Sequence, residues 1–134
     1  MIAVDTSAII AVYIGEPEAE IFSRRIAEEG DAVVSAGTLI ELSIVTLRLS
    51  ANSSELPDDW LDRFLLAGAF RVEPVTLQQT DIARHAYRRF GKGMGHPAQL
   101  NFGDCFSYAL AKSLDIPLLF KGTDFGKTDI ASAL

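Results

Sequence analysis

The sequence predicts an α/β protein, specifically an α/β/α sandwich in which helices flank a central, mainly parallel sheet. Short apolar segments alternate along the chain with longer segments of helical periodicity, and this alternation is typical of parallel strands joined by helices. The chain has 134 residues, of which 49% are hydrophobic and 22% charged. That length and composition are typical of one globular domain, so we expect residues 1–134 to form a single domain.

The first half of the chain is expected to contain two strands and three helices. Residues 1–4 form an apolar strand that ends at Asp5-Thr6-Ser7, a turn and helix-cap signal. Pro17 is expected to open the second helix, because a first-turn proline loses no helical hydrogen bond. The second strand spans residues 32–35, and the helices span residues 7–14, 17–29 and 38–51. The last of these helices is apolar on nearly every side, which indicates a central position or contact with a second subunit.

After a linker at residues 52–55, the second half continues the alternation. A Thr-x-x-Gln capping box opens one of its helices at Thr76, and glycines and a proline mark residues 91–101 as a loop. The predicted helices span residues 57–67, 76–90 and 104–114, the strands span residues 70–75 and 116–120, and residues 122–134 form a loop with a short final turn.

Charge and composition exclude several classes of protein. The net charge of −6 and the sequence pI of about 4.8 are unlike those of a duplex-DNA binder, which usually has a basic face. A single cysteine, Cys105, rules out an internal disulfide bond. No apolar run approaches the ~18–20 residues of a membrane span, and the first residues do not resemble a signal peptide. We therefore expect a cytoplasmic protein that does not contact a membrane.

Four acidic residues are expected at one edge of the sheet. Asp5 directly follows the first strand, and Asp124 follows the last strand within a few residues. Glu41 lies early in the helix after the second strand, and Asp104 opens the helix before the last strand. Because ligands of parallel α/β sheets bind outside the carboxyl ends of the strands, the sequence predicts a functional site made of these four acids.

Each acid also has a local explanation. Glu41 would complete a capping box with Thr38, Asp104 and Asp5 would cap the helices that follow them, and Asp124 would close a glycine-flanked turn. Capping does not explain why four carboxylates converge, since gathered carboxylates repel one another. A bound divalent cation does explain it.

The residue types favour Mg²⁺ or Mn²⁺. Carboxylates without a matching cluster of histidines and cysteines suit hard cations that keep several waters and share phosphate oxygens. We expect Asp5 and Asp104 to be the principal ligands. Glu41 and Asp124 are expected to bind through water or to help deprotonate the nucleophile, and the sequence does not separate these two roles.

Other polar residues near the acids have two interpretations each. Thr6 and Ser107 are candidate supporting residues. Thr6, with Ser7, either orients Asp5 or touches phosphate, or it caps the first helix; Ser107 either positions a metal-bound water or bonds to the backbone of its own helix. Cys105 is interpreted as a small core residue, because no base accompanies it. A basic run (Arg84, Arg88, Arg89 and Lys92) is either a solvated helix face or a contact for RNA phosphates.

Taken in order, these motifs resemble the PIN-domain nucleases and, more narrowly, the VapC toxins of bacterial VapBC toxin–antitoxin pairs. The resemblance rests on Asp5-Thr6-Ser7 after the first strand, Glu41 early in a helix, Asn101-Phe102-Gly103-Asp104-Cys105 at the start of another, and Thr123-Asp124-Phe125 after the last strand. It covers essentially the whole chain.

The resemblance implies an endoribonuclease that depends on Mg²⁺ or Mn²⁺ and cleaves tRNA or ribosomal RNA. It also implies a homodimer that a cognate antitoxin inhibits by filling the acidic cleft. Asp5, Glu41 and Asp104 match the family's core acids, Asp124 matches the acid after the last strand, and Thr6 matches the hydroxyl residue after the first acid. Many PIN proteins have an acid or amide where this chain has Gly122. Asp129 either compensates as an alternative fourth acid or caps the final turn.

Two other functions remain open at this point. A phospho-accepting receiver domain also gathers acids at strand ends and has a lysine after its last strand, a position that Lys121 occupies here. Its acceptor aspartate, however, is missing, because the strand at residues 32–35 ends in serine. The second alternative is a PIN-fold interaction module that has lost its catalytic activity.

Overall fold

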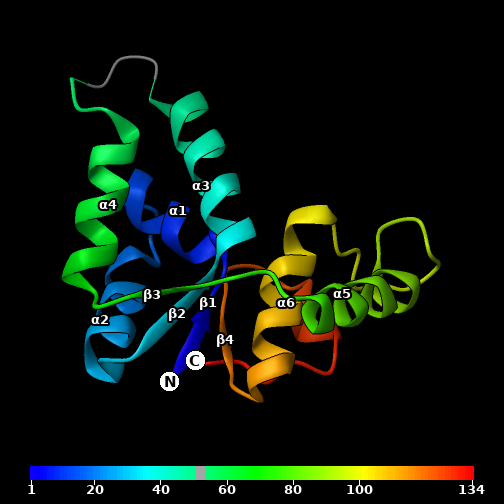
Figure 1. Cartoon of the computed structure of the whole chain (residues 1–134). Helices are drawn as coiled ribbons and strands as arrows, with labels where there is room; N and C mark the ends of the chain where they lie inside the picture. The colour runs from blue at the N-terminus through cyan, green and yellow to red at the C-terminus, as the bar shows by residue number, and fades with distance from the viewer. Residues whose placement is uncertain (51–53) are drawn as a thin grey trace.

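The protein is a four-stranded sheet with helices on both faces (Figure 1), as seen in a computed structural model that describes residues 1–50 and 54–134. The predicted α/β/α sandwich is confirmed. Its strands are β1 (Ile2–Val4), β2 (Ala32–Ser35), β3 (Arg71–Glu73) and β4 (Leu118–Leu119). Its helices are α1 (Thr6–Ile14), α2 (Ala19–Glu29), α3 (Ala36–Leu49), α4 (Pro57–Ala67), α5 (Leu77–Phe90) and α6 (Phe102–Leu114), followed by a 3-10 turn, η1 (Phe125–Lys127).

The sheet has the strand order β3-β2-β1-β4, and every neighbouring pair is parallel. From β1 the chain moves outward through β2 to β3 and then crosses to the opposite side of β1 to form β4. The order therefore reverses between β1 and β4, which is where open α/β sheets bind their ligands. Asp5 and Asp124 follow these two strands.

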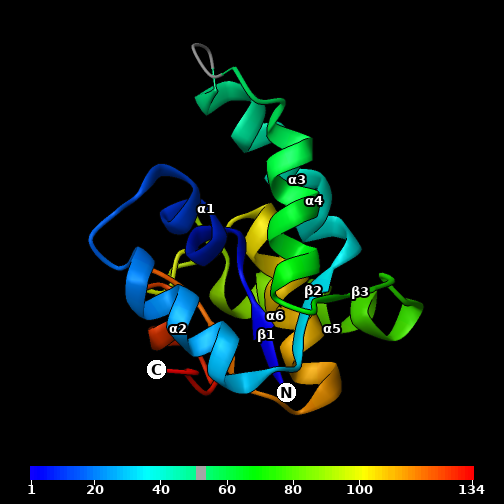
Figure 2. The same ribbon diagram turned by 90° about the vertical axis from the view of Figure 1, so that its left-hand side faces the viewer.

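Alternating side chains of the strands divide the core into two layers. Ile2 and Val4 pack with α1, α2, α3 and α4, whereas Ala3 points to the opposite face and packs with α5 and α6. Val34 and Val33 of β2 divide in the same way, as the two-residue period of a strand requires. Figure 1 shows this division, with α1 to α4 on one side of the sheet and α5 and α6 on the other, and Figure 2 looks onto the first layer, with α3 and α4 projecting together beyond the carboxyl edge of the sheet.

Several helix boundaries differ from the sequence-based prediction. The helix predicted from Pro17 begins at Ala19, because the Ala19 N–H bonds to the Glu16 carbonyl and closes a turn that contains the proline. The helix predicted from Thr38 begins at Ala36, because the Ser35 side chain accepts a hydrogen bond from the Gly37 N–H and caps it directly after β2.

The bounds of the last helix and of two strands also differ from those expected from the sequence. The helix predicted from Asp104 begins at Phe102. The strands predicted at residues 70–75 and 116–120 are shorter, at three and two residues. The helix predicted at residues 57–67 has the expected bounds. The end of the predicted helix at 38–51 and part of the linker at 52–55 lie outside the described residues. Within the described ranges, no helix has the length and apolar character that crossing a membrane requires.

Candidate active site

The carboxylate of Asp5 is buried and held by three hydrogen bonds. Its side chain is 2% exposed. Oδ2 accepts bonds from the Ser7 N–H (2.9 Å) and hydroxyl (2.6 Å), and Oδ1 accepts one from the hydroxyl of Ser107 on α6 (2.6 Å). Because an ionised carboxylate away from water needs such donors, these bonds make its position possible. Asp5 also caps α1, as expected, but its bond to Ser107 joins residues 102 positions apart.

A hydroxyl of α3 extends the network behind Asp5. Thr38 Oγ1 lies 3.2 Å from Ser107 Oγ, and both side chains are buried. Since Ser107 has one proton and donates it to Asp5, the Thr38 hydroxyl donates to Ser107. Thr38 therefore supports Asp5 through Ser107, and it does not cap α3 as its capping-box interpretation predicted.

Glu41 lies in the second turn of α3 and reaches across to the starts of two other helices. The Thr6 hydroxyl donates a hydrogen bond to Glu41 Oε1, and Glu41 Oε2 occupies the space that a Cβ on Gly103 would need. Partial burial, together with the charge of Asp5, raises the pKa of Glu41, although the bond from Thr6 opposes this rise. The capping-box explanation of Glu41 is wrong, because Ser35 caps α3.

Asp104 is the third residue of α6 and forms a capping box with Asn101. The Asp104 N–H donates to Asn101 Oδ1 (2.8 Å), and the Asn101 N–H donates to Asp104 Oδ2 (2.9 Å). Burial, opposed by the bond from Asn101 and joined by the charges of Asp5, Glu41 and Asp124, raises the pKa of Asp104 to about 7. The structure thus brings Asp5, Glu41 and Asp124 within electrostatic reach of Asp104.

Asp124 follows β4 at the start of η1 and is exposed, and its side chain does not cap that turn. Asp129, the alternative fourth acid, lies elsewhere. It accepts hydrogen bonds from the Tyr108 hydroxyl (2.6 Å) and from Lys112 Nζ (3.1 Å). Asp129 therefore anchors the end of the chain to α6 and does not join the four acids.

The donor set suits a hard divalent cation. The site offers carboxylate oxygens, and none of the four acids forms an ion pair with a lysine or arginine in the described part of the chain. Within residues 1–50 and 54–134, no three acidic, histidine or cysteine side chains are grouped as a ready ligand set. Mg²⁺ commonly takes only one or two carboxylates and completes its shell with water and phosphate oxygens, so the residues present fit such an ion.

The hydrogen bonds and close contacts around the acids include residues that the sequence predicted and residues that it missed. Thr6 contacts Glu41 and not Asp5, the acid that it was expected to orient, and Ser107 contacts Asp5 directly. The roles of Thr38 and Gly103 were missed, because a threonine at a predicted helix start and a glycine in a helix's first turn do not identify their distant partners. A glycine between Phe102 and Asp104 at a helix start was the one available signal of a close approach.

Lys121 forms no ion pair with any of the four acids, all of which are among the described residues. Its ammonium forms ion pairs with Glu16 and, at 3.2 Å, with Glu18, while its backbone N–H donates to Ser7 Oγ (2.9 Å). The lysine therefore fastens β4 to the segment between α1 and α2, and the receiver-domain interpretation loses the residue on which it rested.

Comparisons with known proteins identify the family of this chain. Residues 2–131 match the PIN domain family. Ribonuclease VapC28 of Mycobacterium tuberculosis is 45% identical over 131 residues, which cover 98% of this chain and 96% of the relative. Ribonuclease VapC of Mycolicibacterium smegmatis is 42% identical over 129 residues, covering 96% and 97% of the two chains.

Two solved structures share the fold. The crystal structure of VapC20 from Mycobacterium tuberculosis, described as a sarcin–ricin loop cleaving toxin, has a TM-score of 0.74 at 20% identity and covers 98% of this chain and 97% of that one. A toxin–antitoxin complex from Klebsiella pneumoniae has a TM-score of 0.68 at 16% identity, with coverage of 100% and 98%. The receiver-domain alternative is therefore wrong, and the chain belongs to the PIN-domain family, within the group of VapC ribonucleases.

Proposed function

We propose that this protein is an endoribonuclease, dependent on Mg²⁺ or Mn²⁺, that acts in the cytoplasm as the toxin of a toxin–antitoxin pair. The observation that carries the proposal is the convergence of Asp5, Glu41, Asp104 and Asp124 where the strand order reverses, with each of the other three raising the pKa of Asp104. Neighbouring carboxylates repel one another, so gathering them costs free energy. Groups with pKa values raised in this way cluster at functional sites. We further propose that residues 1–134 work as one nuclease domain.

The residues of the chain divide into ligands and supports. Asp5 and Asp104 would hold the cation, because they come from the strand end and the helix start that flank the reversal of strand order. A bound divalent cation supplies positive charge that offsets both the carboxylates and the phosphodiester, and it makes water more acidic. Ser7 and Ser107 fix the orientation of Asp5. Of Glu41 and Asp124, one would take the single proton that the attacking water releases, and the other would bind the cation through water.

The named relatives support RNA as the substrate and a protein as the inhibitor. The curated relatives are named ribonucleases, one structural neighbour is described as cleaving the sarcin–ricin loop, and another is a complex of toxin with antitoxin. We therefore propose a structured tRNA or ribosomal RNA as substrate. We also propose that a cognate antitoxin covers the acidic edge of the sheet.

An apolar stripe on α3 supports the proposal of a homodimer. Ile40, Ile44 and Leu47 are 65%, 47% and 67% exposed, and their spacing places them along one side of the helix. Because α3 and α4 project together from the body of the protein (Figures 1 and 2), this stripe is accessible to a second copy.

Isosteric substitution of the proposed ligands tests the function. We expect Asp5→Asn and Asp104→Asn each to reduce RNA cleavage by about 100-fold or more, because the amide removes a negative charge while keeping the size of the side chain. Cleavage of a tRNA and ribosomal RNA mixture is measured with Mg²⁺, Mn²⁺ and EDTA. Full cleavage by either variant, or undiminished cleavage in EDTA, would contradict the proposed mechanism.

Thermal unfolding gives a second readout that does not depend on activity. Mg²⁺ should raise the Tm of the wild-type protein with increasing concentration, because a ligand of the folded state stabilises it. The Asp104→Asn variant should show a much smaller rise. A wild-type Tm that does not respond to Mg²⁺ or Mn²⁺ would instead support the inactive PIN-fold module.

A further inference from the structure

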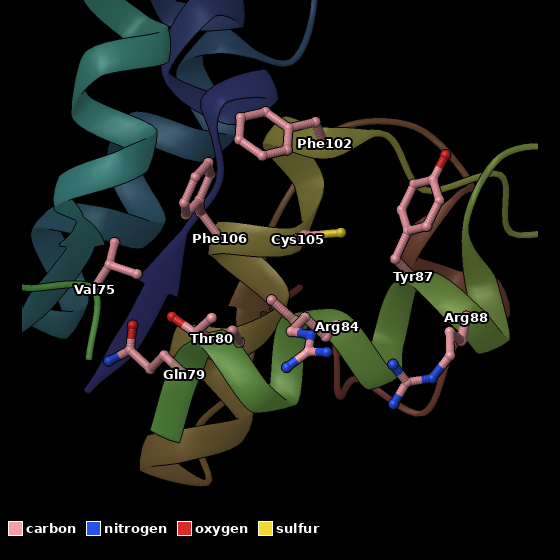
Figure 3. A pocket seen from close by; sticks show the side chains of 11 residues that line it. Val75, Gln79, Thr80, Arg84, Tyr87, Arg88, Phe102, Cys105 and Phe106 are labelled. Atoms are coloured by element: carbon pink, nitrogen blue, oxygen red, sulfur yellow. The ribbon is translucent and has the colours of Figure 1, made fainter. Parts of the chain in front are cut away.

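A groove of about 580 Å³ lies between α5 and α6, next to the candidate active site but outside it (Figure 3). Cys105, Phe106 and Ala109 of α6 and Ala83 of α5 are among the residues that line it. Figure 3 shows the Cys105 sulfur and the Tyr87 ring facing the space between the two helices. Its volume is in the range typical of small-ligand sites, and none of the four acids lines it.

Phe102 lies at the end of this groove that is nearest the acids. Its side chain is 78% exposed, and its ring meets Phe106 edge to face with 5.1 Å between the centroids. The next two residues are Gly103, against which Glu41 packs, and Asp104. A large aromatic ring that is not part of the core therefore lies exposed to solvent directly beside the carboxylates.

Two arginines of α5 line the same groove. Arg84 and Arg88 are exposed. Arg84 lies 3.9 Å from Asp81, but both of these side chains are more than 60% exposed, so the pair is weak. Arg88 forms no ion pair with any carboxylate of residues 1–50 and 54–134. In a protein of net charge −6, this groove thus combines an apolar interior with two available cations.

We propose that the groove between α5 and α6 binds an unpaired nucleobase of the RNA substrate, next to the phosphodiester that is cleaved. The base stacks on Phe102 and enters the apolar groove, and the neighbouring phosphates lie against Arg84 and Arg88. Aromatic rings that stack bases and arginines that contact the backbone are the usual features of single-stranded RNA sites. This inference rests on the proposed ribonuclease function and assigns part of its substrate specificity to residues outside the acidic site.

Charge complementarity favours RNA over an apolar partner in this groove. A second copy of this chain, with its net charge of −6, would bring no net positive charge to offset the acids that adjoin Phe102. An RNA strand with one base in the groove instead places its phosphates by the arginines and carries the adjacent phosphodiester toward Asp104.

The test measures RNA binding without cleavage. A fluorescein-labelled, single-stranded oligoribonucleotide of mixed sequence is titrated with protein in EDTA, and binding is followed by fluorescence anisotropy. Phe102→Ala should weaken binding about tenfold, and Phe102→Trp should restore it. Arg88→Gln should weaken binding and reduce the slope of log K against log salt by about one.

Matched controls use similar exposed side chains on the opposite face of the sheet. Leu66 of α4 is 83% exposed, and the Arg24 side chain of α2 is 61% exposed. Leu66→Ala and Arg24→Gln should bind the oligoribonucleotide as tightly as the wild type. A labelled strand of the same length with abasic sites keeps its phosphates but has no bases to stack, so the wild type and Phe102→Ala should bind it equally.

The outcomes separate this inference from the proposed function. If Phe102→Ala binds the mixed-sequence RNA as tightly as the wild type, the groove inference fails, whether or not the wild type cleaves RNA. The same holds if Phe102→Ala leaves RNA binding unchanged but alters the protein's mass in solution, because a second copy then occupies the groove. If Phe102→Ala selectively loses affinity for base-containing RNA, the groove inference stands even if Asp104→Asn cleaves normally and the proposed mechanism fails.

Discussion

At the scale of single residues, the candidate site depends on small contacts between helix starts. Glu41 comes within reach of Thr6 because the residue opposite it on α6 is Gly103, which has no side chain to block the carboxylate. Asp5 is held by Ser107, and Ser107 by Thr38. Each of these contacts joins residues from different helices, so one added methyl group is enough to change the position of an acid.

Gly103→Ala should reduce RNA cleavage at least tenfold while leaving the fold intact. The new methyl group displaces the Glu41 carboxylate, and misplaced catalytic groups lose activity steeply. Alanine also favours a helix over glycine by about 1 kcal/mol, which offsets the cost of moving a flexible side chain. Cleavage rates and Tm are measured together.

Gly126→Ala is the matched control for this substitution. No other group lies within 4 Å of a Cβ placed there, and its backbone is not in the left-handed region. We expect this variant to cleave RNA normally. Normal cleavage by Gly103→Ala would show that the approach of Glu41 to α6 has no role in catalysis.

At the scale of elements, α6 has a different task at each of its two ends. Its first turn carries Asp104, and its later turns hold the end of the chain through Tyr108 and Lys112, which both bond to Asp129. Burial raises the pKa of Asp129, but the bonds from Tyr108 and Lys112 outweigh burial and leave that pKa below its usual value. Asp129 therefore stabilises the protein and takes no part in the acidic site.

Asp129→Ala should lower the Tm by about 3–5 °C without reducing RNA cleavage. The substitution leaves the Tyr108 hydroxyl without its partner, which costs about 1 kcal/mol. Because folding lowers the pKa of Asp129, its ionic contribution is present above the unfolded value of about 3.9. That contribution is lost as the pH falls through the folded value.

The difference in Tm between the wild type and Asp129→Ala should accordingly narrow below a pH of about 4. Thermal unfolding monitored by circular dichroism across this range is the measurement. A loss of cleavage by Asp129→Ala at a temperature where the variant remains folded would return Asp129 to the list of candidate catalytic acids.

At the scale of the whole molecule, α3 contributes to the core, to the site and to the surface at once. Leu42 is buried against α1 and α4, Glu41 belongs to the acidic site, and Ile40, Ile44 and Leu47 face outward. The apolar character of this helix, noted in the sequence, is therefore divided between an interior face and an exposed stripe. The side chains of the exposed stripe are not buried by any contact within the described part of this chain.

Ile44→Asp should convert the proposed homodimer to a monomer, because a carboxylate in an apolar interface loses its hydration. Sedimentation or light scattering at micromolar concentration gives the mass. Leu77→Asp is the control, since Leu77 is 78% exposed and belongs to α5 and not to α3, and it should leave the mass unchanged. A wild-type protein that is monomeric under these conditions would contradict the homodimer.

The sequence by itself determined the architecture and the edge at which the acids gather. Periodicity and helix-start signals act over a few residues, so they located the strands, the helix at residues 57–67 and the position of Asp5 after β1. Parallel strands place their carboxyl ends at one edge, and this rule was sufficient to predict a site containing Asp104 and Asp124.

Only the tertiary structure decided how the acids are held and what lies beside them. The bond between Ser107 and Asp5 spans 102 positions, and the approach of Glu41 to Gly103 joins two helices on opposite sides of the sheet edge. Sequence signals that act over a few residues carry no information about such pairs. The pairs form only when the crossover helices pack against one another. The groove beside Phe102 and the anchoring of Asp129 arise from the same packing, which explains why neither was evident from the sequence.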